Sequence, residues 1–233
     1  MGRLHRCNFH CIARMFPVTF GQYNENYIDA PFYTNHDMGR SAGYYAGENS
    51  EKQTKLAGAM NLFMSGSAFL YYGEELGMKG AGKDENKRAP MYWSTDAEKA
   101  GMCDGPADMD DFQMKFGSLE EQEQSPDSIY QYYKKVIKIR NQNPEIARGE
   151  VEYLESVSGD SFCVLKKTWE GSEVLLVFHT GAETAELDMS GIMVNGAEIS
   201  EGNIRGALES GEERIVLSNG TITMPGYSVL VLK

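Results

Sequence analysis

The chain has 233 residues, 41% of them hydrophobic, which is enough for one large packed domain or two smaller ones. Its 34 acidic and 22 basic residues give a net charge of −12, which disfavours binding to the phosphate backbone of nucleic acids. No apolar run approaches the roughly 18 residues of a membrane-spanning helix, so we expect neither a nucleic-acid partner nor a membrane partner.

Residues 1–16 show no clear periodicity, and we expect a poorly ordered leader there. The segment has basic residues but no apolar stretch of about 7–15 residues, so it does not resemble a secretory signal. It also contains His5, Cys7, His10 and Cys11 close together. No second ligand pair follows at the spacing of a zinc finger, so we expect no metal and no cofactor.

Residues 17–149 have the pattern of alternating strands and helices. Residues 17–26 read as a helix end or loop, and the apolar residues 27–34 predict a short buried strand. A capping box beginning at Ser50 predicts a helix that stops at Gly66. Residues 68–72 predict a second strand, and a strand, a helix and a strand in this order indicate a parallel βαβ unit.

A long stretch without regular periodicity covers residues 77–124, and a helix follows it. Ser125 is the predicted cap of this helix, with Pro126 in its first turn. Asn143-Pro144 is expected to end it. The residues of its predicted buried face are Ile129, Tyr132, Tyr133, Val136 and Arg140.

From residue 150 onward the hydrophobic period changes to two, which predicts β-strands. Strands are expected at residues 151–156, 161–169, 174–179 and 227–232. Asn195-Gly196 and Asn219-Gly220 predict tight hairpin turns. We therefore expect residues 150–233 to form an antiparallel β-sandwich of about seven short strands.

The sequence Asn35-His36-Asp37 stands where the first predicted strand ends. In a β/α barrel the carboxyl ends of the strands carry the active site. A carboxylate fixed beside a sugar ring stabilises the oxocarbenium-like transition state of glycoside hydrolysis, and hydrogen bonds to ring hydroxyls hold the distorted sugar. On spacing alone, an ordinary polar contact between His36 and Asp37 is the other interpretation.

Four motifs in order resemble the α-amylase family of glycoside hydrolases (family 13). They are Phe32-Tyr33-Thr34-Asn35-His36-Asp37 with Arg40, Tyr71-Tyr72-Gly73-Glu74-Glu75-Leu76-Gly77-Met78, Lys87-Arg88-Ala89-Pro90-Met91-Tyr92-Trp93, and the segment from Gln122 to Ser128 before the Tyr-rich helix. The resemblance covers residues 20–150. It implies a multi-domain α+β fold: the C-terminal quarter of a (β/α)8 TIM barrel at residues 17–149, then the β-sandwich.

The resemblance also implies roles for single residues. Asp37 would be the acidic residue that binds sugar hydroxyls and stabilises the transition state, and His36 would hydrogen-bond the same sugar. Asn35 is expected to orient the loop more than to touch the substrate. Arg40 either supports the structure or lines the cleft.

Asp84 and Arg88 are four residues apart, and in similar members of the family such a pair holds a sugar on the non-reducing side. Glu85 replaces the proline usual there, so a solvated ion pair is an equal alternative. Glu74 and Glu75 are expected to make structural salt bridges. Tyr92 and Trp93 either stack on sugars or pack the loop.

The family reaction also needs a carboxylate nucleophile and a protonated acid on earlier strands. No matching segment precedes Asp37, and 36 residues are too few for six β/α units. We therefore expect a C-terminal portion of a retaining α-glucosidase or α-glucanase, inactive alone, whose substrate is an α-glucan or oligosaccharide. Its expected protein partner is the missing N-terminal barrel portion, or a second copy that associates through exposed strands. The alternatives are a non-catalytic carbohydrate-binding or scaffolding module and an inactive truncated product.

Overall fold

The computed structural model describes residues 27–233, and the structural statements below concern that part of the chain. The predicted leader, the segment at 17–26 and the His5–Cys11 cluster lie outside it. The chain divides into two compact units. The barrel unit contains residues 31–63 and 68–138, and the sandwich unit contains residues 64–67 and 139–233 together with the described residues up to 30.

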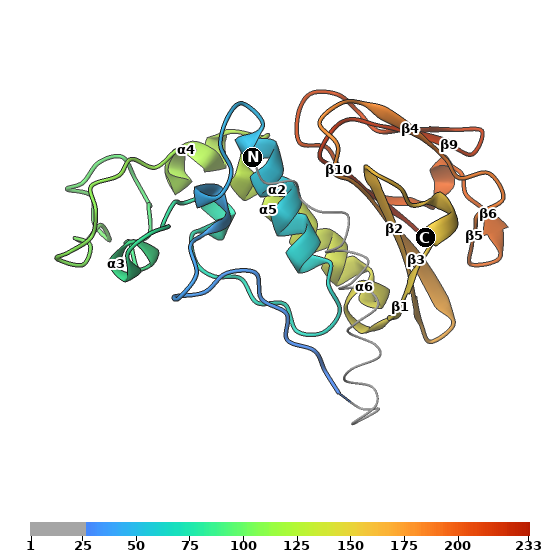
Figure 1. Cartoon of the computed structure of the whole chain (residues 1–233), viewed down its shortest axis with the longest axis horizontal. Helices are drawn as coiled ribbons and strands as arrows, with labels where there is room; N and C mark the ends of the chain where they lie inside the picture. Colours follow the sequence, from blue (N-terminus) through green and yellow to red (C-terminus); the bar gives the residue numbers. More distant parts are fainter. Residues whose placement is uncertain (1–26) are drawn as a thin grey trace. The chain divides into compact units, whose positions relative to one another are not determined.

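The regular elements of the barrel unit are all helices, joined by long irregular segments. Its elements are η1 (Ser41–Gly43), α2 (Ser50–Leu62), η2 (Glu74–Leu76), α3 (Asp84–Lys87), α4 (Leu119–Gln124) and the greater part of α5 (Ile129–Gln142). Figure 1 shows α2 and α5, with α3 in the extended loop region that follows η2. The buried face predicted for α5 is confirmed, because Ile129, Tyr132, Tyr133, Val136 and Arg140 are all buried.

The predicted helix starts were wrong in detail. Ser50 lies inside α2, whose N-cap Asn49 makes no side-chain capping bond, and the Ser50 hydroxyl instead accepts a hydrogen bond from Lys115. The helix ends at Leu62, before Gly66. Ser125 ends α4 instead of starting α5, and Ser128 takes the capping role because its Oγ accepts from the Gln131 N–H at 3.2 Å. Ser125 is therefore the residue that ends α4, and the residue that caps α5 lies three positions later, at Ser128.

The two strands predicted at residues 27–34 and 68–72 are not formed. Both segments lack regular secondary structure, and neither joins a ladder with any other described residue. Phe32 and Phe69 are 57% and 54% exposed. A strand needs a neighbour that accepts its backbone hydrogen bonds, and these segments have none within residues 27–233. The predicted order of segment, helix and segment is therefore present, but the two segments do not form a sheet within residues 27–233.

In the sandwich unit, α6 (Pro144–Arg148) follows the end of α5. Asn143-Pro144 ends α5 as predicted, and Pro144 starts the new helix. A five-stranded antiparallel sheet has the order β1-β2-β3-β10-β7, and a three-stranded sheet has the order β4-β9-β8 (Figure 1). The elements are β1 (Glu150–Tyr153), η3 (Glu155–Val157), β2 (Phe162–Trp169), β3 (Ser172–His179), β4 (Ala185–Asp188), β5 (Met193–Val194), β6 (Ala197–Glu198), η4 (Glu201–Asn203), β7 (Ile204–Leu208), β8 (Val216–Ser218), β9 (Thr221–Met224) and β10 (Ser228–Leu232).

Both predicted Asn-Gly turns are confirmed. Asn195-Gly196 joins β5 to β6, Asn219-Gly220 joins β8 to β9, and all four residues have positive φ, as this hairpin turn requires. The core of the unit consists of apolar residues from both larger sheets, among them Val164, Leu175 and Leu230 facing Leu217 and Ile222. The unit therefore buries its own hydrophobic core. Across the described residues, no helix has the length and apolarity to cross a bilayer.

A buried lysine holds part of the sandwich unit together. Lys167 on β2 is 1% exposed, and its Nζ donates to the Ile146 carbonyl at 2.7 Å and to the Ser65 hydroxyl at 3.0 Å. Burial, and then the positive charge of Arg140, lower the pKa of Lys167 to about 7. The folded chain therefore releases this proton at a lower pH than the unfolded chain, whose reference value is 10.5.

We expect the free energy of unfolding of this unit to rise with pH between about 7 and 10, because the unfolded chain binds more protons at Lys167 in that window. The rise should be on the order of a few kcal/mol. Urea unfolding followed by Trp169 fluorescence in a Trp93→Phe background measures it. Lys167→Met should remove the rise. Lys166→Met is the matched control, because Lys166 is bonded to Glu152 and keeps a raised pKa. A rise unchanged in Lys167→Met contradicts the assignment.

Candidate functional site

The loop that carries His36 and Asp37 is an ordered turn of the barrel unit. The Asn35 Oδ1 accepts the Asp37 N–H at 2.8 Å, and the Asn35 carbonyl accepts the Met38 N–H at 3.2 Å. Asn35 therefore shapes the turn with its own side chain. The side chains of His36 and Asp37 are 63% and 68% exposed, and His36 Nε2 lies 3.3 Å from Asp37 Oδ2. The turn thus presents an imidazole and a carboxylate side by side to solvent.

Arg40 lies on the protein side of the same loop. It is fully buried, and it donates from Nε to the Tyr72 carbonyl at 2.8 Å and from Nη1 to the Lys79 carbonyl at 3.0 Å. Its guanidinium also packs over the rings of Tyr71 and Tyr72, with centroid distances of 5.0 and 4.5 Å. This burial favours the structural role for Arg40 over a place in a substrate cleft.

Glu74 and Glu75 also lie below the surface of the barrel unit. The Glu74 carboxylate is buried and accepts hydrogen bonds from Thr34 and Ser41. Glu75 is half-buried, and burial raises the pKa of both carboxyls above the ordinary value. The Glu74 carboxylate is bonded by neutral donors of Thr34 and Ser41, and not by the cation of a salt bridge as expected.

Asp84 and Arg88 lie at the two ends of the short helix α3, and both are exposed. The Asp84 carboxylate is bonded to Lys87 Nζ at 2.7 Å, and Arg88 Nη1 donates to the Asp84 carbonyl at 2.9 Å. The Lys87 hydrogen bond, with the charges of Lys87, Arg88 and His36, lowers the pKa of Asp84. The structure therefore brings Asp84 and Arg88 together, and Asp84 lies close enough to His36 to feel its charge. The ion-pair partner of the Asp84 carboxylate, however, is Lys87 and not Arg88.

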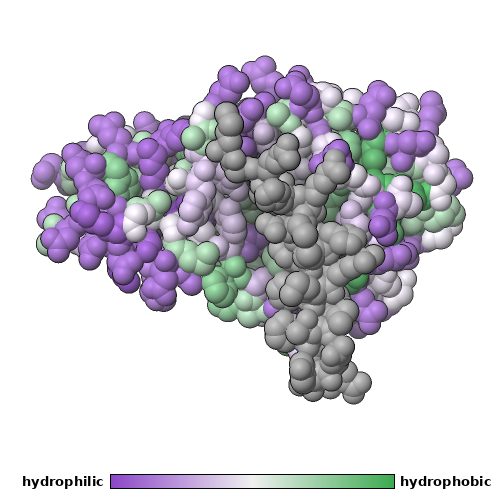
Figure 2. Space-filling model, in the orientation of Figure 1, coloured by the Kyte–Doolittle hydropathy of each residue, from purple (hydrophilic) through white to green (hydrophobic). Residues whose placement is uncertain are grey.

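Tyr92 and Trp93 have different surroundings. Tyr92 packs against the small buried cluster of Leu76, Met78 and Ala89. Trp93 is 43% exposed. Packing of the loop therefore describes Tyr92, and Trp93 remains accessible for stacking. Figure 2 shows that hydrophilic residues dominate the surface of the end that carries α3 in Figure 1.

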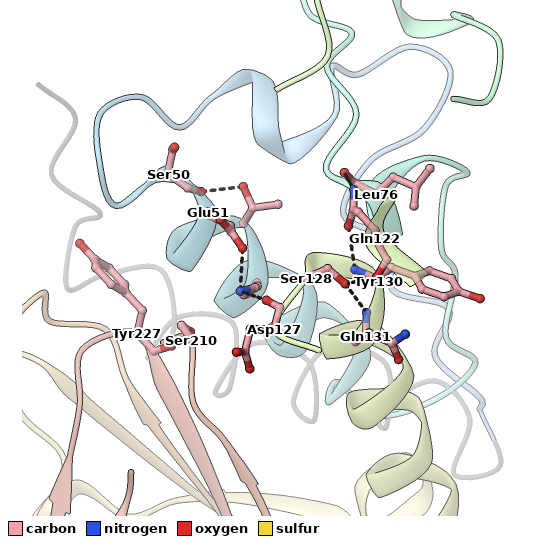
Figure 3. A network of polar contacts seen from close by, with 12 residues as sticks. Ser50, Glu51, Leu76, Gln122, Asp127, Ser128, Tyr130, Gln131, Ser210 and Tyr227 are labelled. Atoms are coloured by element: carbon pink, nitrogen blue, oxygen red, sulfur yellow. Dashed lines mark hydrogen bonds and ion pairs between the residues drawn. The ribbon is translucent and has the colours of Figure 1, made fainter. Parts of the chain in front are cut away.

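A polar network centred on Gln122 links the η2 segment to the start of α5. No local pattern in the sequence predicts it. The Gln122 side chain donates to the Leu76 carbonyl at 2.8 Å and accepts the Tyr130 N–H at 3.1 Å, while Ser128 Oγ donates to the Gln122 carbonyl at 2.7 Å (Figure 3). One glutamine thus joins the η2 segment to the start of α5. Residues 27–233 contain no group of three or more His, Cys, Asp or Glu side chains able to hold a metal ion.

Comparison with known proteins identifies the family. The family described as "Alpha amylase, catalytic domain" matches residues 2–149, more than half of the chain. Alpha-amylase 3 of Dictyoglomus thermophilum is 31% identical over 158 residues, which are 68% of this chain and 31% of that protein. The 4-alpha-glucanotransferase of Thermotoga maritima is 31% identical over 160 residues, which are 66% of this chain and 35% of that protein.

A solved structure shows the same fold. Eubacterium rectale Amy13B matches with a TM-score of 0.85 and 45% identity, over 91% of this chain and 40% of that one. This confirms the expected fold class, the end of a β/α barrel followed by a β-sandwich, with no closed barrel among the described residues. The chain spans about a third of the curated relatives named above. It belongs to the α-amylase family of glycoside hydrolases.

Proposed function

We propose that this chain is the C-terminal portion of a retaining glycosidase that cleaves α-glucosidic bonds in starch-like glucans or in malto- and isomaltooligosaccharides. The observation that carries the proposal is the exposed pair of His36 and Asp37 on an ordered turn, in a chain of the α-amylase family. The names of the relatives, an α-amylase and a 4-α-glucanotransferase, support α-glucans as the substrate class.

In this proposal Asp37 holds negative charge against the sugar as the glycosidic bond breaks. Positive charge develops on the ring in the oxocarbenium-like transition state, and a fixed carboxylate stabilises it. His36 donates a hydrogen bond to a hydroxyl of the same ring. Asp84 and Arg88 bind a neighbouring sugar, and Arg88 is free to do so through the guanidinium nitrogens that do not bond Asp84.

The nucleophile and the general acid come from a complementary barrel portion. Retention requires two carboxyl groups about 5–5.5 Å apart, one of which attacks while the other protonates the leaving oxygen. No Arg-x-Asp segment before an apolar strand precedes Asp37 in this sequence. The chain therefore supplies one of the three carboxylates and part of the substrate site.

A graft tests this proposal. The part of Amy13B that this chain matches is replaced by residues 17–233, and hydrolysis of maltooligosaccharides is measured. The proposal expects turnover by the graft and none by Amy13B lacking that part. A soluble, folded graft that binds maltooligosaccharides without any turnover would favour the carbohydrate-binding alternative. The sandwich offers little support for that alternative, because Phe162, Phe178 and Tyr227 are buried.

We also propose that the open face of the barrel unit recruits a protein partner. The segments at residues 27–34 and 68–72 leave Phe32, Phe69, Leu70 and Tyr72 between 38% and 57% exposed, and neither segment joins a ladder within the described chain. Some carbonyls of these segments have partners, such as Tyr72 with Arg40 and Phe69 with Asn61, but exposed apolar side chains beside backbone outside any ladder favour association. The complementary barrel portion would cover this face, and a second copy covers it when the chain is alone.

The isolated chain should therefore associate at micromolar concentration, as measured by light scattering after size exclusion. The double change Phe32→Ser, Phe69→Ser should shift it to the monomer. Val216→Ser is the control, because Val216 is 52% exposed on the sandwich and lies on neither segment. A wild-type chain that stays monomeric at tens of micromolar would refute the association.

A further inference from the structure

We propose that Glu74 is a positioning residue that fixes both ends of the loop carrying His36 and Asp37. The proposal rests on the function proposed for Asp37. Glu74 touches neither of the two exposed side chains. It acts through Thr34, which directly precedes the loop, and through Ser41, which directly follows it.

Three hydrogen bonds converge on the Glu74 carboxylate. Its Oε1 accepts from Thr34 Oγ1 at 2.8 Å and from the Ser41 N–H at 2.9 Å, and its Oε2 accepts from Ser41 Oγ at 2.5 Å. One side chain thus joins the residue before the six-residue loop to the residue after it. The separation of the loop ends is set by a single carboxylate.

The Glu74 carboxylate is buried, and its hydrogen bonds compensate for that burial. Glu74 is 2% exposed, and burial raises the pKa of its carboxyl, while the hydrogen bonds from Ser41 and Thr34 and the charge of Arg40 act in the opposite direction. A buried charge is costly unless it is hydrogen-bonded. Its three hydrogen bonds from Thr34 and Ser41 go to the two ends of the loop.

Two other contacts hold the remaining parts of the loop. Asn35 Oδ1 fixes the turn at Asp37, and the Arg40 guanidinium ties the last loop residue to the carbonyls of Tyr72 and Lys79. With Glu74 at both ends, the backbone that carries Asp37 is restrained at each side of the exposed pair. Misplacement of a catalytic group by about 1 Å can lower turnover about 100-fold, so the restraint has a catalytic consequence.

The neighbouring carboxylate provides a matched control. Glu75 also has a raised pKa caused first by burial, and its Oε2 is buried with no hydrogen-bond partner among the described residues. The carboxylate that Thr34 and Ser41 bond is that of Glu74 and not that of Glu75. Glu75→Gln therefore changes a similar buried carboxyl one residue away without releasing the loop.

Hydrogen exchange followed by mass spectrometry on this chain tests the inference directly. We expect Glu74→Ala to raise exchange in peptides covering residues 31–45 by ~10-fold or more, because the loop ends are released. Glu74→Gln should stay near wild type, because its amide oxygen still accepts from Thr34 and from the Ser41 N–H, and its NH2 can donate to Ser41 Oγ. Glu75→Gln should leave these peptides unchanged.

Two further readouts separate positioning from a general loss of stability. The His36 ring signals in the NMR spectrum should shift in Glu74→Ala and not in Glu75→Gln. Ser41→Ala, which removes only the Oγ donor, should give an intermediate increase in exchange if Glu74→Ala fails to fold. In the graft, Glu74→Ala should lower kcat more than it raises KM, and Glu74→Gln should restore kcat.

Unchanged exchange in Glu74→Ala, or an equal increase in Glu75→Gln, would overturn the inference. A loosened loop with undiminished kcat in the graft would also overturn it. Failure of the proposed function looks different, because Asp37→Asn would then keep full turnover whatever the exchange data show.

Discussion

The Asp37→Asn variant of the graft is expected to lose turnover by ~10²-fold or more, because removal of one preorganised group aimed at developing charge has an effect of this size. The change keeps the shape of the side chain and removes only its charge. The Asp37 side chain is exposed and its one ion pair among the described residues is with His36, while the backbone bond from Asp37 N–H to Asn35 Oδ1 is kept in the variant, so the fold should not suffer. The loss should therefore appear in kcat, with unchanged thermal unfolding.

Two comparison variants divide the site into its proposed roles. His36→Ala should lower kcat less than Asp37→Asn, because it removes a hydrogen bond and leaves the charge. Arg88→Ala should mainly raise KM, because Arg88 is proposed to hold a sugar away from the reacting bond. Asp111→Asn is the control. Asp111 is an exposed carboxylate in the loop between α3 and α4, and this variant should behave as wild type. Wild-type turnover in Asp37→Asn would show that the role given to Asp37 is wrong.

The features that the sequence predicts best are local ones. Asn-Gly at 195–196 and at 219–220 determines its own turn, since both residues must adopt positive φ, and the structure has them so. The apolar period of α5 is local in the same way, and its buried face is correct. The Asn35-His36-Asp37 motif is contiguous, so its turn and exposure could be expected from the sequence.

The features that the sequence could not predict depend on distant partners. Residues 27–34 and 68–72 have the composition of strands, but a strand exists only where a neighbouring strand is present, and neither segment has one within residues 27–233. The capping signals were ambiguous for different reasons: two serines, Ser125 and Ser128, precede α5, and at α2 the residue before Ser50, Asn49, is the N-cap. Glu74 and Gln122 act across 33 and 46 residues of chain, to Ser41 and Leu76 respectively, and no local pattern contains such contacts.

The second large effect concerns the chain on its own. Catalytic carboxylates act as a unit, so under the proposed function the isolated chain should show no measurable hydrolysis. The sandwich unit has its own core and should remain folded in the isolated chain. Hydrogen exchange over residues 31–138 should be measured on the same preparation, because the proposed site lies in the barrel unit and not in the sandwich.

Turnover by the highly purified chain, on maltooligosaccharides and on an aryl α-glucoside, tests the central claim most directly. Wild type and Asp37→Asn should be measured side by side, so that a contaminating glycosidase is recognised by equal activity in both. We predict no turnover from either preparation, and turnover only when the chain completes the graft. Hydrolysis by the wild-type chain that disappears in Asp37→Asn would contradict the claim, since the chain would then hold a complete catalytic site.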